Sequence, residues 1–230
     1  YSCVLRLNIY KSNKEDYILS EFDVQIINNF PRINVSNLGC EDLTGIQNFK
    51  RLSFLNCSNN NISTLDVSSL TNLKHLDCSY NKGISELCVS NCLELEELDC
   101  SGTNIDFLDV SYCSKLKALN CNDTNIESLY LLKCTELKNL DCSDTKISRL
   151  DVSALEKLYS LKCYNTDISY IDTYNLHNLS NLDCSETKIE SLDVSRCPNI
   201  KNLKCSRTEL GELNAGNLSK LETLDCSSTN

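Results

Sequence analysis

Sixteen cysteines and two histidines are the residues of this 230-residue chain whose types could carry covalent chemistry. A cysteine nucleophile needs a neighbouring histidine or cation to form the thiolate. His75 and His177 lie five repeats apart, and His75 should point to the opposite side from Cys78, the cysteine that follows it. We therefore expect no catalytic residue and no enzymatic activity.

The spacing of the cysteines and glycines does not indicate a metal or cofactor site. Zinc sites are typically built from C-x-x-C pairs. The tightest pair here is Cys88 and Cys92, and no matching second pair accompanies it. Glycine-rich phosphate loops are absent from the sequence. We expect neither a metal site nor a cofactor.

The cysteine spacing reveals an internal repeat rather than a disulfide framework. Nine cysteines follow one another at steps of 21 residues, except one step of 22 that Gly83 explains. They are Cys57, Cys78, Cys100, Cys121, Cys142, Cys163, Cys184, Cys205 and Cys226. Four more share a column with leucines: Cys92, Cys113, Cys134 and Cys197. A column that accepts Leu or Cys favours buried apolar groups, so these thirteen cysteines are predicted to be reduced and buried.

Three cysteines fall outside these columns. Cys88 takes a column otherwise held by aspartates, which predicts an exposed thiol. Cys3 and Cys40 lie upstream of the repeats, and a disulfide between them is left open. Neighbouring strands lie about 4.8 Å apart, so distance alone does not forbid bridges within the ladder either.

Composition excludes several classes of protein. The net charge is −10, from 32 acidic and 22 basic residues, which argues against nucleic-acid binding. No apolar run approaches the roughly 18 residues that span a bilayer, so no membrane insertion is expected in this segment. With 41% hydrophobic residues the chain is typical of globular proteins, and 6 Gly and 2 Pro exclude collagen-like sequence.

Each repeat predicts a short strand followed by turns. Leu137, Leu140 and Cys142 have the L-x-x-L-x-L spacing of a strand that points alternate side chains inward. A column of Asn and then Thr follows, and these side chains are expected to hydrogen-bond the backbone of the next coil. Between strands the apolar period is three, which favours extended or 3₁₀ turns over an α-helix. We predict an N-terminal cap, partly helical, over residues 1–42 and one continuous repeat array over residues 43–230.

The repeat resembles the leucine-rich repeat, in a variant similar to bacterial surface proteins of the internalin type. The residues that carry this resemblance are L-D-C-S-x-T/N-x-I-x-x-L-D-V-S, repeated through the array. The resemblance implies an α/β solenoid: a right-handed superhelix of stacked short parallel strands with few or 3₁₀-type helices. Residues 17–23, 33–36 and 42–46 are similar to the helical cap of that group. The calcium-type loop that some relatives carry after this element is missing after Asp23.

Three sets of outward residues are candidates for partner binding. One repeat adds four tyrosines, which would form an aromatic patch of the kind enriched at binding hot spots. These are Tyr159, Tyr164, Tyr170 and Tyr174. A second patch would be formed by Phe54, His75 and Tyr80. The third set is a row of acidic residues on the strand face, which should attract cations or basic partners: Asp77, Asp99, Asp141 and Asp183. Whether this row binds calcium is left open, as is the alternative that it only keeps the sheet soluble.

We interpret the chain as a non-catalytic module that binds a protein partner. The resemblance implies surface adhesion or host-surface interaction, and an extracellular or cell-surface location. The alternatives are a structural spacer or a carbohydrate-binding segment of a larger surface protein. The oligomeric state, the partner's identity and the presence of other domains are left open.

Overall fold

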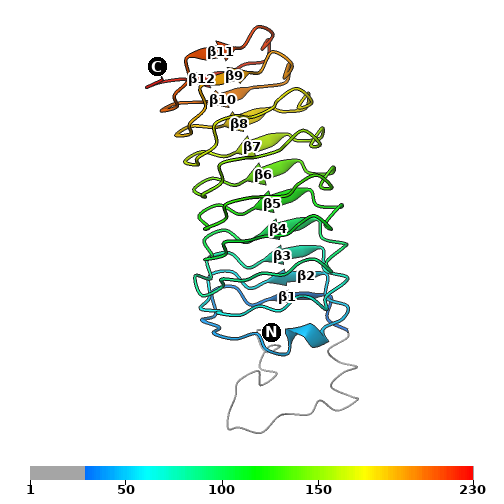
Figure 1. The fold of residues 1–230 in the computed structure, drawn as a ribbon. Coiled ribbons are helices and arrows are strands. Elements are labelled where there is room, and N and C mark those ends of the chain that lie inside the picture. The colour runs from blue at the N-terminus through cyan, green and yellow to red at the C-terminus, as the bar shows by residue number, and fades with distance from the viewer. Residues whose placement is uncertain (1–28, 230) are drawn as a thin grey trace.

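The computed structural model describes residues 29–229, and the chain forms a column of stacked coils with short parallel strands along one face (Figure 1). The first part of the expected cap, including Cys3, lies outside the described residues. Ten strands form one sheet in the order β1-β2-β3-β4-β5-β6-β7-β8-β10-β12, and β11 pairs with β9 in a second sheet. The predicted solenoid of stacked short parallel strands is confirmed.

All strands have three residues and pair in parallel. They are β1 (Arg32–Asn34), β2 (Phe54–Asn56), β3 (His75–Asp77), β4 (Glu97–Asp99), β5 (Ala118–Asn120), β6 (Asn139–Asp141), β7 (Ser160–Lys162), β8 (Asn181–Asp183), β9 (Ser191–Asp193), β10 (Asn202–Lys204), β11 (Glu212–Asn214) and β12 (Thr223–Asp225). Their register is exact from coil to coil: Leu55 pairs with Leu76, and Leu140 with Leu161. Each repeat therefore adds the same strand directly beside the preceding one.

The core runs the length of the column because each coil contributes the same apolar positions. The central leucine of a strand, such as Leu55 or Leu161, is fully buried, whereas its two neighbours face outward. Where the sequence period is three, the backbone makes i→i−3 hydrogen bonds, as from the Leu73 nitrogen to the Leu70 oxygen at 2.9 Å. Among the described residues the one helix is η1 (Ile46–Asn48), a single 3₁₀ turn. None of the helices in residues 29–229 is long and apolar enough to cross a membrane.

A left-handed residue ends the turn after almost every strand. Non-glycine residues at positive φ are uncommon, yet here they recur at the same position of successive coils. They are Asn37, Asn59, Tyr80, Asp123, Asp144, Asn165, Glu186, Arg207 and Ser228, with Gly102 at the same position of its own coil. A Cβ atom on Gly102 would lie 2.7 Å from the ring of Tyr80, so the glycine makes room for that aromatic side chain.

The Asn and Thr column was expected to bond the next coil, and this prediction was wrong. Asn60 donates from Nδ2 to the Val35 oxygen of the preceding coil at 2.9 Å, and Asn81 donates likewise to Cys57. Threonines bond within their own coil, as Thr103 Oγ1 does with the Cys100 oxygen at 2.7 Å. The amide of Asn is long enough to reach the neighbouring coil, whereas the threonine hydroxyl reaches only the carbonyl three residues back.

Candidate functional site

The strand face carries a groove of about 490 Å³ that extends over β2 to β7. It is lined by the outward side chains on either side of each central leucine, because a strand exposes every second residue. They include Phe54, Asn56, His75, Asp77, Glu97, Asp99, Ala118, Asn120, Asn139, Asp141, Ser160 and Lys162. We call this the strand-face groove.

An aromatic pair lies at one end of the strand-face groove. The rings of Phe54 and His75 are 6.0 Å apart at their centroids and tilted by 46°. The guanidinium of Arg32 lies 3.9 Å from the centre of the Phe54 ring on its other side. His75 Nδ1 is 3.0 Å from Glu97 Oε2, which orients the imidazole. The structure therefore brings together two of the three residues in the expected Phe54, His75 and Tyr80 patch.

The acidic row on the strand face also has a structural role. Oδ1 of Asp77 accepts hydrogen bonds from the backbone nitrogen of Ser79 at 3.1 Å and from its hydroxyl at 2.7 Å. Asp99 and Ser101 repeat this arrangement one coil further on. Such a bond ties down the first residues of the turn that follows the strand. The D-x-S pattern of the repeat is thus explained by local backbone geometry.

In Asp99, Asp141 and Asp183 the other carboxylate oxygen has a partner on the next coil. Asp99 Oδ2 accepts from Asn120 Nδ2 at 3.0 Å. Asp141 Oδ2 lies 3.2 Å from the ammonium of Lys162, and Asp183 Oδ2 lies 3.7 Å from that of Lys204. The two lysines that interrupt the row therefore reduce the repulsion expected between stacked carboxylates. Within residues 29–229 there is no group of three or more His, Cys, Asp or Glu placed to hold a metal ion.

The four tyrosines of the expected aromatic patch lie in three different places. Tyr170 and Tyr174 line a pocket of about 330 Å³, where the guanidinium of Arg196 lies 4.2 Å from the centre of the Tyr174 ring. Tyr159 lines a separate pocket beside lysines. Tyr164 is half-buried in the turn after β7, where burial and the Asp144 carboxylate raise the pKa of its phenol. A 21-residue coil encircles the core once, so positions five or six residues apart face different directions.

Tyr80, the third residue of the expected Phe54, His75 and Tyr80 patch, lies apart from the other two. Tyr80 occupies the left-handed turn after β3 and its ring packs over Gly102, away from the strand-face groove. Its chain position five residues after His75 suggested proximity, but the intervening residues carry the backbone around the end of the strand.

The cysteine columns are buried and free of disulfides among the described residues. Twelve of the thirteen expected buried thiols are buried, but Cys226 is exposed because no described coil covers the last strand. Burial raises the pKa of Cys57 to about 12 and that of Cys92 to about 11. The thiols donate weakly across coils, as Cys78 Sγ does to the Asp99 oxygen at 3.5 Å. These groups pack as small apolar side chains.

The two other described cysteines differ from the columns. Cys88 is exposed, as predicted, and its sulfur lies 3.3 Å from the hydroxyl of Ser90, in the place where an aspartate bonds a serine in other coils. Cys40 is half-buried and unbridged.

Two further concave regions were missed by sequence reasoning. One, of about 840 Å³, follows the threonine column along the turns, and four of its charged side chains form two ion pairs. Lys188 lies 2.6 Å from Asp167, and Arg207 lies 2.9 Å from Glu186. The other contains Tyr159 and four lysines. The signal that could have found the second site is the pair of short side chains Asn178 and Ser180, which lie in two columns where most coils carry charged residues.

Comparisons with known proteins define the class first. A family model for leucine-rich repeats, in two copies, matches residues 50–92. The stacked coils described above have the architecture of a leucine-rich repeat solenoid, a fold typical of protein–protein interaction modules. No curated protein matches the chain.

Solved structures then place it near particular relatives. The functional domain of InlJ from Listeria monocytogenes, which includes a cysteine ladder, is 28% identical, with a TM-score of 0.54, over 88% of this chain and 59% of that one. An internalin, InlF, from the same organism is 20% identical, with a TM-score of 0.68, over 90% and 76% of the two chains. The resemblance to internalin-like leucine-rich repeat proteins is thereby confirmed. The chain spans 59% of the length of the InlJ domain.

A more distant likeness concerns the fold alone. The leucine-rich repeat ectodomain of a plant membrane receptor kinase from Arabidopsis thaliana, solved in complex with a Casparian strip integrity factor, is 22% identical, with a TM-score of 0.75. That match covers 83% of this chain and 26% of the receptor chain.

Proposed function

We propose that this chain is a non-catalytic recognition module whose strand-face groove binds a basic segment of a partner protein. The observation that carries the proposal is the lining of this groove. An aromatic pair, Phe54 and His75, lies beside four carboxylates and a single lysine, Lys162. The carboxylates are Asp77, Glu97, Asp99 and Asp141.

The charge of the groove favours a basic partner. Of the four carboxylates, only Asp141 is paired with a lysine, whereas Glu97 lies against His75 and Asp99 accepts a hydrogen bond from Asn120. Clefts lined by one sign of charge raise the rate at which oppositely charged partners associate. The aromatic pair would provide the apolar anchor that binding hot spots contain.

The rigidity of the groove also supports recognition. Every strand is fixed by its neighbours, and Asp77 and Asp99 are each held by two hydrogen bonds from the serine two residues further on. Side chains that are already ordered lose little conformational entropy when a partner binds.

A role in adhesion at a bacterial surface belongs to the same proposal. Its support is the likeness to the internalins and to a receptor ectodomain, together with a fold typical of interaction modules. The extracellular or cell-surface location rests on the same likeness. A structural spacer, the competing proposal, would need no groove of this composition.

The test compares two variants that remove equal aromatic content from different faces. The chain carrying Phe54→Ser and His75→Ser should bind its partner protein with an affinity lowered about tenfold or more. The reason is that hot-spot aromatics contribute on the order of 1–2 kcal/mol each. The control carries Phe107→Ser and Tyr112→Ser, two exposed aromatics outside the groove. Affinity is measured by surface plasmon resonance with the purified partner at low and high salt.

Three outcomes would contradict the proposal. If no partner protein binds the wild-type chain, the spacer is favoured. If both double variants weaken binding equally, the groove is not the binding surface. If binding is unchanged when Asp77→Asn and Asp99→Asn remove two charges, the partner is not recognised by its basic character, since asparagine retains the acceptor for the serine.

A further inference from the structure

A second concave site lies at the N-terminal ends of the strands. It has a volume of about 560 Å³ and shares no lining residue with the strand-face groove. We call it the lysine pocket. Its lining residues are Lys138, Lys157, Tyr159, Asn178, Ser180, Asn199, Lys201 and Lys220.

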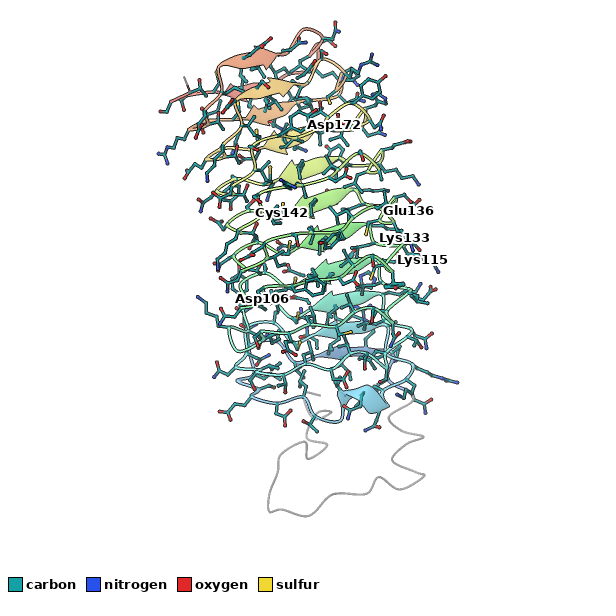
Figure 2. All side chains as sticks on the ribbon, viewed as in Figure 1. Asp106, Lys115, Lys133, Glu136, Cys142 and Asp172 are labelled. Atoms are coloured by element: carbon teal, nitrogen blue, oxygen red, sulfur yellow. The ribbon has the colours of Figure 1, made fainter. Side chains whose placement is uncertain are left out.

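The repeat explains how the pocket forms. Two outward columns flank the buried leucine that precedes each strand, and most coils carry long charged side chains there. Figure 2 labels Lys115 and Glu136, which belong to one of these columns, at the edge of the molecule where the strands begin. The coil before β8 instead carries Asn178 and Ser180. These short side chains leave a depression between the longer side chains of the coils on either side.

The lysines make the pocket basic in a chain whose net charge is −10. Lys157 lies 2.5 Å from Glu136 and Lys201 lies 3.2 Å from Glu222, while Lys220 donates to Asn199 Oδ1 at 2.6 Å. Lys138 has no ion-pair partner among the residues that the structure describes. All these pairs are exposed, and exposed pairs contribute little stability, so an anionic ligand can replace the carboxylates at small cost.

Ser180 provides an independent indication of a ligand. It is 2% exposed and lines the pocket, yet its hydroxyl oxygen has no hydrogen-bond partner. Buried polar groups in folded proteins are nearly always paired, because leaving one unpaired costs stability. The oxygen itself is covered, so the Ser180 side chain would rotate toward the pocket to let a ligand hydroxyl or anionic oxygen supply the missing partner.

We propose that the lysine pocket binds a segment of an acidic polysaccharide. The sulfate or carboxylate groups would contact the ammonium groups, a sugar ring would lie against the half-exposed ring of Tyr159, and a sugar hydroxyl would bond Ser180. The lysines are spread over five successive coils, from the one before β6 to the one before β12. With strands about 4.8 Å apart, this corresponds to a length of about 19 Å, which suits a chain ligand better than a single phosphate.

An acidic peptide is the competing occupant. It would satisfy the lysines, but its extended backbone has no saturated ring to stack on Tyr159. The largely aliphatic walls, formed by the stems of the lysines, also suit the non-polar faces of sugar rings. The inference stands apart from the proposed function, since the two sites share no lining residue.

The decisive experiment measures binding of defined polymers by isothermal titration calorimetry at low salt. The probes are oligosaccharides of dextran sulfate, of polygalacturonate and of neutral dextran, and poly-glutamate of matching length. Lys138→Gln with Lys201→Gln should weaken binding of an acidic oligosaccharide about tenfold, because two exposed charge contacts are lost. The control, Lys74→Gln with Lys117→Gln, removes two lysines from the same column outside the pocket and should change affinity less than about twofold.

Ser180→Ala separates binding from folding. Removing an unpaired hydroxyl should leave the melting temperature unchanged or raised, yet weaken oligosaccharide binding about threefold by deleting one hydrogen bond. The proposal is supported if either acidic oligosaccharide binds and the variants weaken that binding as stated. The oligosaccharide with the higher affinity then identifies the preferred anionic group, sulfate or carboxylate. Failure of both to bind, equal losses in the control variant, or poly-glutamate binding as tightly as the oligosaccharides would each overturn it.

Discussion

Aspartates in this chain serve the backbone before they serve any partner. The repeat contains D-x-S twice, once at the end of the strand and once in the L-D-V-S segment. In both, the carboxylate accepts hydrogen bonds from the residue two positions later, as Asp151 does from the nitrogen of Ser153 at 3.0 Å and from its hydroxyl at 2.6 Å. These bonds lower the pKa of the Asp151 carboxyl. An acidic row read from sequence alone thus combines a structural requirement with a surface charge.

Replacing Asp151 tests this role. Asp151→Ala should lower the free energy of unfolding by about 1 kcal/mol, since the turn loses its side-chain acceptor, whereas Asp151→Asn keeps the acceptor and should cost less. Chemical denaturation at neutral pH provides the measurement. Equal losses in the two variants would show that charge, rather than hydrogen bonding, is what matters.

The same carboxyl predicts a direction of pH dependence. Because its pKa is lower in the folded chain than in the unfolded chain, its stabilisation is present above the unfolded pKa and is lost as pH falls through the folded pKa. The Asp151→Asn variant should therefore lose less stability than wild type between neutral and strongly acidic pH.

The thiols offer a second test at the scale of residues. Burial raises the pKa of the column cysteines, to about 12 for Cys57 and Cys113, so they should not react with a thiol reagent in the native chain at mildly alkaline pH. Cys88 and Cys226 are exposed and should react quickly. Mass spectrometry of native and denatured protein, without reductant, counts the labels, and Cys88→Ser should remove one fast label. Four or more bridged pairs would contradict packed thiols.

At the scale of elements, one coil is a residue longer than the others, and it accommodates the insertion because the inserted residue is glycine. The longer repeat contains Gly83, and a Cβ atom there would lie 2.7 Å from the Ile62 oxygen of the preceding coil. The backbones of the two coils therefore approach closely at this point.

Gly83→Ala should separate these coils and lower the free energy of unfolding by about 1–3 kcal/mol, the range found for overpacking. Gly211→Ala is the matched control, because a Cβ there meets no atom within 4 Å. Thermal unfolding compares the two variants, and a Gly83→Ala protein as stable as the control would refute the close approach.

The strands themselves were predictable because the L-x-x-L-x-C spacing recurs without interruption. The reach of the turn contacts was not, since Asn60 and Thr103 both bond the carbonyl three residues back but only Asn60 also bonds the preceding coil. Their side chains differ in length, and a pattern that treats both as polar cannot distinguish their reach.

At the scale of the molecule, a stack of identical coils separates its surfaces by column. The strand-face groove takes its residues from the positions beside the central leucine, and the lysine pocket takes its residues from the start of the strand. Because neighbouring coils contact each other and few residues further away, variants on one face should leave the other site intact. The two proposed ligands can therefore be tested independently in the same protein.

The sequence by itself determined the repeat, the buried columns and the parallel stack, because a period of 21 residues with fixed apolar positions has one efficient way to bury them. Only the tertiary structure decided which outward residues become neighbours. It distributed four tyrosines that are close in the chain over three places, paired Asp141 with Lys162 one coil away, and brought Lys138, Lys201 and Ser180 to one pocket. The physical reason is that neighbours across coils are one repeat apart in sequence, while neighbours in sequence turn to different faces.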